Sequence, residues 1–378
     1  MEFIQIKPTI LELLGLIPNK IAKIVLKIRL NYASQMMGLT YHEDYNKYDL
    51  GTDHPLIGDK PKKTMDFLKK KKLLDKIDIF KPKKATEKDI LLVHDQKYVD
   101  SVRQLSLNGG MLSSDTPAPK GIYEVALIPT GGTILAGIKL FEGYQIMANP
   151  LAGFHHASRS FASGFCFFND IAIVTEKLRR KYNLKRILIL DLDVHHANGT
   201  QEIYYDDPNV LNLSFHQDGR TLYPGTGAID KIGRDKGEGY TVNLPLLPYT
   251  GDKSYIYAFE NIIPKLTEEF NPEIIIYQCG VDTHHSDPLA DLFLTYQTYY
   301  YLAKRIRELS EKTCKKLLVL FGGGYNSDAS VISYYNIICG LLNKKNYISE
   351  NEVIDKNFEA TTKLVKNLKT ILKPHWNL

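Results

Sequence analysis

The ten residues Ile187-Leu-Ile-Leu-Asp-Leu-Asp-Val-His-His196 decide how this chain folds. Four successive apolar residues, 187–190, predict a strand buried on both faces, as in a parallel sheet. Asp191, Asp193 and His195 follow at a spacing of two, which in extended chain places them on the same side. Two carboxylates and an imidazole at a buried strand end are costly unless a positive charge lies beside them. The stretch therefore predicts a divalent metal ion at this end of the strand.

The bulk composition is that of a globular enzyme-sized chain. The 378 residues are 44% hydrophobic and 24% charged, ordinary values for a soluble protein. A net charge of +5 is too small for this length to indicate a nucleic-acid partner. The four cysteines show no Cys-x-x-Cys spacing, so we expect reduced thiols and a cytoplasmic location. No apolar run reaches the roughly 18 residues that span a bilayer, so no transmembrane segment is expected.

Apolar runs alternate with helical patterns along the middle of the chain. Strands are predicted at residues 145–148, 187–190, 210–215, 274–277 and 317–321. Helices are predicted at residues 133–141, 170–181, 255–270 and 295–312. This alternation predicts an α/β fold with a single open, mostly parallel sheet flanked by helices on both faces.

The chain is divided into one domain with an extension at each end. Residues 39–342 are predicted to form the domain, and residues 343–378 a C-terminal helical tail that packs on it. Residues 1–38 are predicted to be an N-terminal helical extension, in which residues 21–30 are basic and amphipathic. Its apolar face is expected to dock on the domain or on a second subunit, which would make a homo-oligomer; the alternative is a membrane surface.

Polar residues follow four of the predicted strands. His155 and His156 come after the first, Asp191 and its neighbours after the second, Asp282 after the fourth and Tyr325 after the fifth. In open α/β sheets ligands bind at the carboxyl ends of the strands. We therefore expect these side chains to meet at one edge of the sheet.

Asp193, His195 and Asp282 together make a three-ligand metal site. Three protein ligands leave one position open, which is typical of catalytic rather than structural zinc. The alternative is that the two aspartates are helix N-caps or partners in ion pairs.

The paired histidines suit two roles beside a water molecule. One of His155 and His156 can act as general base and the other as an electrostatic or proton-donating partner, with Asp191 and Asn198 fixing their tautomers. Tyr325 follows three glycines and can donate a hydrogen bond to an oxyanion. The alternatives are core histidines and an aromatic residue at the rim.

Aromatic residues in glycine-containing loops, Phe165 and Tyr223, can wall a narrow apolar channel or belong to the core. A further doublet, His284 and His285, is interpreted as solvated loop residues, with a second metal site as the alternative.

With these motifs in place, the chain resembles the histone deacetylase family, in the bacterial and archaeal branch with acetoin-utilisation and acetylpolyamine deacetylase proteins. The resemblance covers residues 41–342. The matching segments are Tyr48-Asp-Leu-Gly-Thr-Asp-His54-Pro55, Ser114-Asp115-Thr-Pro117, Gly153-Phe-His155-His156-Ala, Ser163-Gly-Phe165-Cys-Phe-Phe-Asn169-Asp170, Asp191-Leu-Asp193-Val-His195-His196, Tyr223-Pro-Gly-Thr-Gly227, Gln278-Cys-Gly-Val-Asp282 and Gly322-Gly-Gly-Tyr325.

The resemblance implies a role for each residue of the site. Asp193, His195 and Asp282 are implied to be zinc ligands, and Tyr325 to polarise the substrate carbonyl. The catalytic histidine pair is implied to be oriented by Asp191 and Asn198. The implied substrate-binding residues are Asp115 at the rim and Gly164, Phe165, Tyr223 and Leu289 around the acyl-lysine tunnel. A structural K⁺ or Na⁺ ion is implied at Asp191, Asp193, His195, Ser214 and Phe215.

The chain departs from the family pattern at three places. Asn198 replaces the aspartate of class I enzymes, and Lys60-Pro-Lys-Lys63 stands where many members carry arginine, which bears on acetate exit. Leu289 stands where the polyamine-specialised member has an acidic gatekeeper, which weakens the case for a polycationic substrate.

We therefore expect a zinc-dependent deacetylase, with Fe²⁺ as an alternative metal. Its substrate is expected to be acylated lysine on a protein or a small acylated amine. The alternatives are an acetylpolyamine or small-metabolite amidohydrolase, a binuclear-metal ureohydrolase and a non-catalytic protein that binds acyl-lysine.

Overall fold

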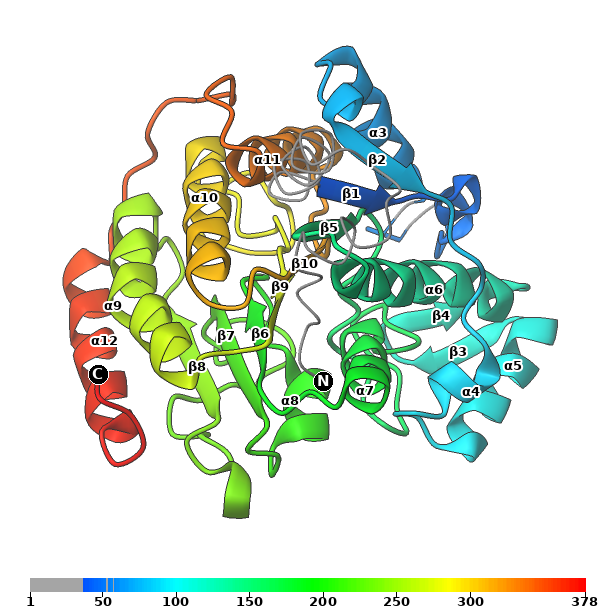
Figure 1. Ribbon diagram of the computed structural model, residues 1–378, viewed down its shortest axis with the longest axis horizontal. Helices are drawn as coiled ribbons and strands as arrows, with labels where there is room; N and C mark the ends of the chain where they lie inside the picture. Colours follow the sequence, from blue (N-terminus) through cyan, green and yellow to red (C-terminus); the bar gives the residue numbers. More distant parts are fainter. Residues whose placement is uncertain (1–36, 52–53, 57) are drawn as a thin grey trace, which may run out of the picture.

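The centre of the molecule is an eight-stranded open sheet (Figure 1). The structure is a computed structural model, and it describes residues 37–51, 54–56 and 58–378. The strand order is β2-β1-β5-β10-β9-β6-β7-β8, and each pair of neighbours is parallel. The bounds are β1 Met37–Thr40, β2 Ile77–Phe80, β5 Ile146–Asn149, β6 Ile187–Asp191, β7 Val210–Gln217, β8 Thr241–Leu246, β9 Ile274–Gln278 and β10 Leu317–Leu320. A small antiparallel pair, β3 Gly110–Ser113 and β4 Thr116–Ala118, lies apart from this sheet.

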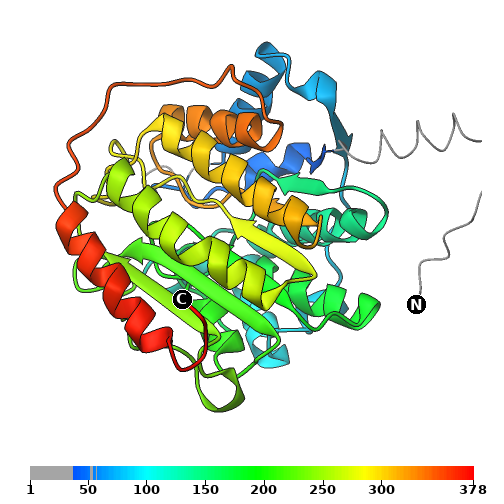
Figure 2. The ribbon, with the colours of Figure 1, turned by 60° about the vertical axis from the view of Figure 1, so that its left-hand side comes forward.

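Helices cover both faces of the sheet, which confirms the predicted fold class (Figures 1 and 2). Leu188 and Leu190 of β6 belong to a core shared with α9, α10 and α11, whereas Ile187 and Ile189 belong to a core shared with α6 and α7. Alternate residues of one strand thus face opposite helical layers. The helices are α3 Lys60–Lys70, α4 Glu87–Ile90, α5 Gln96–Asn108, α6 Ile122–Phe141, α7 Asp170–Tyr182, α8 Asn198–Tyr204, α9 Asp252–Phe270, α10 Tyr296–Lys312, α11 Ser327–Leu341 and α12 Phe358–Leu372; the 3₁₀ turns are η1 Glu43–Lys47, η2 Leu74–Lys76 and η3 Asp235–Gly237.

All five predicted strands are present, with ends that differ by at most two residues from the expected ones. Strands β1, β2 and β8 were not predicted. The first two are only four residues long, too short for a periodic pattern to stand out. β8 contains Pro245, which interrupts a strand pattern, but β8 is an edge strand where a missing amide is tolerated.

Helix α6 begins at Ile122, eleven residues before the predicted start at residue 133, because adjacent glycines look like a break in the sequence. A Cβ added at Gly132 would lie 2.0 Å from the Tyr45 hydroxyl, and a Cβ added at Gly131 would lie 2.0 Å from the Lys83 carbonyl oxygen. The glycines therefore allow the helix to pack closely. By length and composition α6 is also the one helix among the described residues that could cross a membrane, but 67% of that window is buried, so it is a core helix.

The ends of the domain differ slightly from the expected boundaries. Residues 37–38, which the expected N-terminal extension included, open β1 inside the sheet. The rest of that extension, with its predicted helix and its docking surface, lies outside the described residues. At the other end, α12 packs on α9 and β8 (Figure 2). The Trp376 indole N–H donates to the Gly239 carbonyl at 2.7 Å.

Candidate active site

The predicted metal ligands come together at the carboxyl end of the sheet. Asp193 and His195 follow β6, Asp282 follows β9, and all three are buried. His195 Nδ1 lies 3.2 Å from Asp193 Oδ1 and 3.2 Å from Asp282 Oδ2. One ligand atom of each residue lies within 4.8 Å of the others, so the group is a candidate metal centre.

The surroundings of these atoms fit a small cation. Asp282 Oδ2 is buried and accepts no hydrogen bond, which is costly for a carboxylate oxygen unless a cation is bound to it. A Cβ at Gly323 would lie 2.0 Å from this oxygen, and a Cβ at Gly280 would lie 2.0 Å from Asp193 Oδ2. Glycine at both positions keeps the space beside the carboxylates clear of side chains.

The electrostatics of the trio also favour a divalent cation. Burial and the neighbouring charge of Asp193 raise the pKa of Asp282 to about 7. Although burial favours the neutral ring, the neighbouring carboxylates of Asp193 and Asp282 raise the pKa of His195 to about 10. Two carboxylates buried side by side repel each other, and a divalent metal ion would neutralise both charges.

The tandem histidines lie next to the candidate metal centre, each held by the partner expected for it. His155 Nδ1 donates to Asp191 Oδ2 at 2.9 Å, and His156 Nδ1 donates to Asn198 Oδ1 at 2.6 Å. These hydrogen bonds leave Nε2 of each ring without a proton when the ring is neutral. The His156 ring lies 5.7 Å from the His195 ring, measured between centroids.

The pKa values of the two rings are shifted in opposite directions. Burial and the positive charge of His155 and His195 hold the pKa of His156 well below its usual value. Burial also opposes a charged His155, but Asp191 and Asp193 raise the pKa of His155 overall. These opposite shifts suit His156 as a general base and His155 as its electrostatic partner.

Tyr325 follows the glycines at the end of β10, and its backbone is held from two sides. Asp287 Oδ2 accepts a hydrogen bond from the Tyr325 amide at 2.7 Å. The ammonium of Lys60 donates to the carbonyls of Gly322 and Gly324 at 3.0 and 3.1 Å. Desolvation raises the pKa of the Tyr325 phenol well above its usual value, so the hydroxyl keeps its proton and can donate.

A narrow cavity of about 40 Å³ joins these groups. Its lining includes both tandem histidines, Asp193, Phe165 and Tyr325. Gly164 closes one wall at φ +54°, where an added Cβ would lie 2.0 Å from the His156 ring. Phe165 itself has φ 68°, an uncommon conformation for a residue with a side chain, which directs this turn toward the cavity.

The other predicted substrate-binding residues lie outside the lining of this cavity. Asp115 Oδ2 accepts a hydrogen bond from the Gly164 amide at 3.0 Å, so it is attached to the tunnel wall. Tyr223 is 41% exposed, and Leu289 is half-buried in the loop after Asp287. The expected roles of Asp115 at the rim and of Tyr223 and Leu289 around the tunnel remain predictions.

The residues expected to hold a monovalent cation lie on adjacent strand ends. Asp191 of β6 pairs in register with Ser214 of β7, and Phe215 is the next residue. Ser214 Oγ contacts the His216 ring at 2.8 Å and accepts from the Ala197 amide at 3.4 Å. The geometry brings these segments together, and the ion remains a prediction.

Sequence reasoning missed how several residues support the site. Lys60 was considered as part of the Lys60-Pro-Lys-Lys63 stretch, but its ammonium is buried under the Tyr325 loop. Asp287 was given no role, although the Asp-Pro pair was visible. Gln278 ends β9 and donates to Asp193 Oδ2 at 2.9 Å. Neither Lys60 nor Gln278 carries a local signal, because both act on residues distant in sequence.

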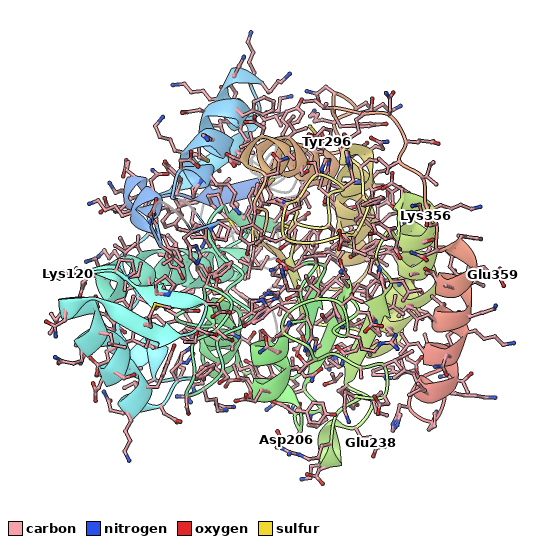
Figure 3. All side chains as sticks on the ribbon, turned by 180° about the vertical axis from the view of Figure 1, so that it is seen from behind. Lys120, Asp206, Glu238, Tyr296, Lys356 and Glu359 are labelled. Carbon is pink, nitrogen blue, oxygen red and sulfur yellow. The ribbon has the colours of Figure 1, made fainter. Side chains whose placement is uncertain are left out.

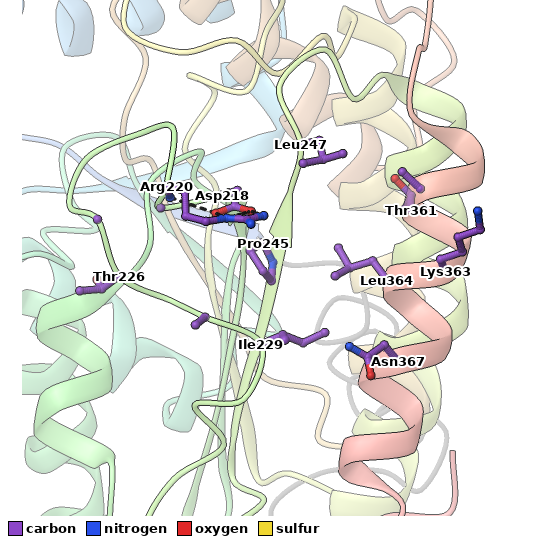
Figure 4. Close-up of a pocket in the computed structure, with 14 residues that line it drawn as sticks. Asp218, Arg220, Thr226, Ile229, Pro245, Leu247, Thr361, Lys363, Leu364 and Asn367 are labelled. Carbon is purple, nitrogen blue, oxygen red and sulfur yellow. Dashed lines mark hydrogen bonds and ion pairs between the residues drawn. The ribbon is translucent and has the colours of Figure 1, made fainter.

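Two further features lie away from this centre. His284 was wrongly expected to be a solvated loop residue: it is buried, because its ring contacts Glu350. With His285 and Glu350 it forms the other group of possible ligand atoms found among residues 37–51, 54–56 and 58–378. A groove of about 660 Å³ runs between α12 and the loop that carries Tyr223 (Figure 4), and it contains none of the predicted site residues. Asp218 and Arg220 form an ion pair on its rim.

Comparisons with known proteins identify a family and several relatives of this chain. A family model described as "Histone deacetylase domain" matches residues 54–341. The chain is 35% identical to a probable deacetylase of Archaeoglobus fulgidus over 89% of this chain and 97% of that one. It is 35% identical to the acetoin utilization protein AcuC of Bacillus subtilis, over 76% of each chain. The crystal structure of the HDA15 HD domain matches with a TM-score of 0.81 at 27% identity, covering 91% of this chain and 96% of that one.

Proposed function

This chain belongs to the histone deacetylase family, and from that premise we propose that it is a metal-dependent deacetylase that hydrolyses the acetyl or short acyl amide of lysine or a related amine. The observation that carries the proposal is the buried Asp193–His195–Asp282 group, which has two histidines and a tyrosine beside it on one small cavity.

The proposed metal is Zn²⁺, and Fe²⁺ accepts the same donors. When bound, the ion supplies Lewis acidity that polarises the amide carbonyl and lowers the pKa of water. Asp193, His195 and Asp282 would hold it. The proposed structural K⁺ or Na⁺ ion would lie behind it, between the ends of β6 and β7.

The chain's own residues are proposed to move the protons. Nε2 of neutral His156 takes a proton from water as the water oxygen bonds to the carbonyl carbon. The Tyr325 hydroxyl donates to the oxyanion that forms. As the carbon–nitrogen bond breaks, a member of the histidine pair gives a proton to the departing amine. Asp191 and Asn198 keep both rings in the required tautomers.

The proposed substrate class follows from the shape of the site. A cavity of about 40 Å³ beyond Phe165 accepts a short acyl group on a slender chain. Acyl-lysine on a protein fits this shape, and so does a small acylated amine. The half-buried Leu289 gives the rim no acidic group at the position where a polyamine-specific enzyme carries one.

Two rival functions have less support. A binuclear ureohydrolase needs bridging carboxylates, but Asp191 already accepts from His155 and from the Asp193 amide. A non-catalytic binding protein would have no use for the oriented histidine pair.

The test is a substrate panel with the metal-loaded protein. Acetyl- and longer acyl-lysine peptides and acetylpolyamines would be assayed for amine release, and metal would be counted per chain. We expect one tightly bound divalent ion and turnover of at least one acyl-lysine substrate. Two catalytic ions per chain would favour the ureohydrolase. No turnover across the panel by metal-replete protein would overturn the enzyme assignment.

A further inference from the structure

A segment outside the matched deacetylase domain lies across the helices next to the site. Residues 346–350 lie between α11 and α12, in the orange stretch that passes α10 in Figures 1 and 2. Asn336 of α11 holds this strap by two hydrogen bonds with Ile348, at 2.9 and 2.7 Å. The Tyr335 hydroxyl donates to the Asn346 carbonyl at 2.7 Å. The strap is therefore fixed to the body by several hydrogen bonds.

Glu350, at the end of this strap, accepts hydrogen bonds from three groups of the site loop and α10. Its Oε1 lies 2.8 Å from His284 Nε2 and 2.8 Å from the amide of Tyr296, the first residue of α10 (labelled in Figure 3). Its Oε2 lies 3.2 Å from His285 Nε2. Its backbone amide donates to Gln297 Oε1 at 3.2 Å. A carboxylate bonded to so many donors fixes their relative positions.

Two imidazoles and a carboxylate also have the composition of a metal site, but the hydrogen bonds favour a clamp. The Ser286 amide donates to His284 Nδ1 at 3.2 Å. Since Nδ1 accepts this hydrogen bond, the proton of the neutral ring lies on Nε2. That Nε2–H points at Glu350, and it has no lone pair left for a metal ion. The cluster is satisfied by its own donors and acceptors.

The loop that Glu350 holds is the one that positions Tyr325. Asp287, three residues after His284, accepts the hydrogen bond from the Tyr325 amide. The Asn326 side chain donates to the carbonyl and hydroxyl of Ser286 at 3.1 and 3.0 Å. A shift of residues 284–287 would therefore move the backbone of Tyr325.

We propose that Glu350 is a positioning residue, which holds the 284–287 loop through His284 and thereby sets the place of the Tyr325 hydroxyl. The role in turnover rests on the proposed deacetylase function, whereas the mechanical link from Glu350 to Tyr325 does not. The strap would thus make the C-terminal segment part of the catalytic unit.

The experiment compares Glu350→Ala and Glu350→Gln with Glu352→Ala. Glu352 is a matched control because it is exposed and lies two residues further along the same connection between α11 and α12. Hydrogen exchange of the peptide containing Tyr325 and Asn326 is measured in all variants. We expect exchange about tenfold faster in Glu350→Ala, with kcat about tenfold lower and KM within twofold. Glu350→Gln should show smaller changes in both the exchange rate and kcat, because its amide oxygen still accepts from His284 and Tyr296.

Three outcomes would overturn the proposal. The first is exchange in Glu350→Ala equal to the Glu352→Ala control. The second is faster exchange with an unchanged kcat. The third is a second divalent ion per chain that is lost in both Glu350 variants, which would make the cluster a metal site. If Glu350→Ala does not fold, Glu350→Gln provides the test. Its exchange must then be faster and its kcat lower than in the Glu352→Ala control. An inactive wild type would refute the deacetylase function, while the exchange data would still test the link.

Discussion

Replacing Tyr325 by phenylalanine tests the proposed chemistry with the smallest change to the structure. Phenylalanine keeps the ring that lies beside Phe165 and His195, at distances of 5.8 and 6.4 Å between ring centroids. The backbone stays attached to Asp287. No residue in the described part of the chain accepts a hydrogen bond from the Tyr325 hydroxyl, so the stability of the fold should change by less than about 0.5 kcal/mol.

The effect on catalysis should be much larger than the effect on folding. Removing one donor to an oxyanion typically lowers kcat by about 10²–10³, or roughly 2.7–4 kcal/mol of transition-state stabilisation. The donor acts mainly on charge that develops during the reaction, so KM should stay within a few-fold of the wild-type value.

The assay is steady-state release of amine from an acetyl-lysine peptide, with thermal unfolding measured in parallel. Tyr249→Phe is a suitable control, because this exposed tyrosine does not line the cavity. A Tyr325→Phe enzyme with kcat within about threefold of wild type would refute the oxyanion role. A raised KM with unchanged kcat would instead assign Tyr325 to ground-state binding.

Three further predictions concern the metal, the buried lysine and acid stability. Asp282→Asn should lower the affinity for Zn²⁺ by at least about tenfold, measured by metal analysis after dialysis against a chelator, and full retention of metal would contradict the ligand assignment. Lys60→Met should destabilise the fold by about 1–3 kcal/mol in denaturant unfolding, because the buried Gly324 carbonyl loses its donor while that of Gly322 keeps the Tyr334 hydroxyl, whereas Lys60→Arg should restore most of this loss. Burial lowers the pKa of His94 from 6.5 to about 4. Between these pH values the unfolded chain binds the extra proton, so the free energy of unfolding decreases by about 1.4 kcal/mol for each unit by which the pH is lowered. His94→Gln should remove that part of the slope, and an unchanged slope would show that His94 is not its source.

Much of the site could be read from local sequence, for a reason that lies in parallel sheets. Asp191 ends a buried strand, Asp193 and His195 come just after it, and Asp282 follows another strand. Parallel strands end at the same edge, so residues just after different strands meet without any knowledge of loop paths. The alternating pattern also predicted the two helical layers. The beginning of α6 was predicted wrongly, because glycines that look like breaks allow a close helix contact.

The sequence by itself determined the reactive groups of this protein and the edge of the sheet where they gather, since both follow from residue type and position along a strand. Only the tertiary structure decided which distant residues hold that chemistry in place. Lys60 reaches the carbonyls before Tyr325, and Glu350 reaches the loop after Asp282. Such contacts join residues far apart in the chain, and long-range packing of loops and helices, which has no local period, brings them together.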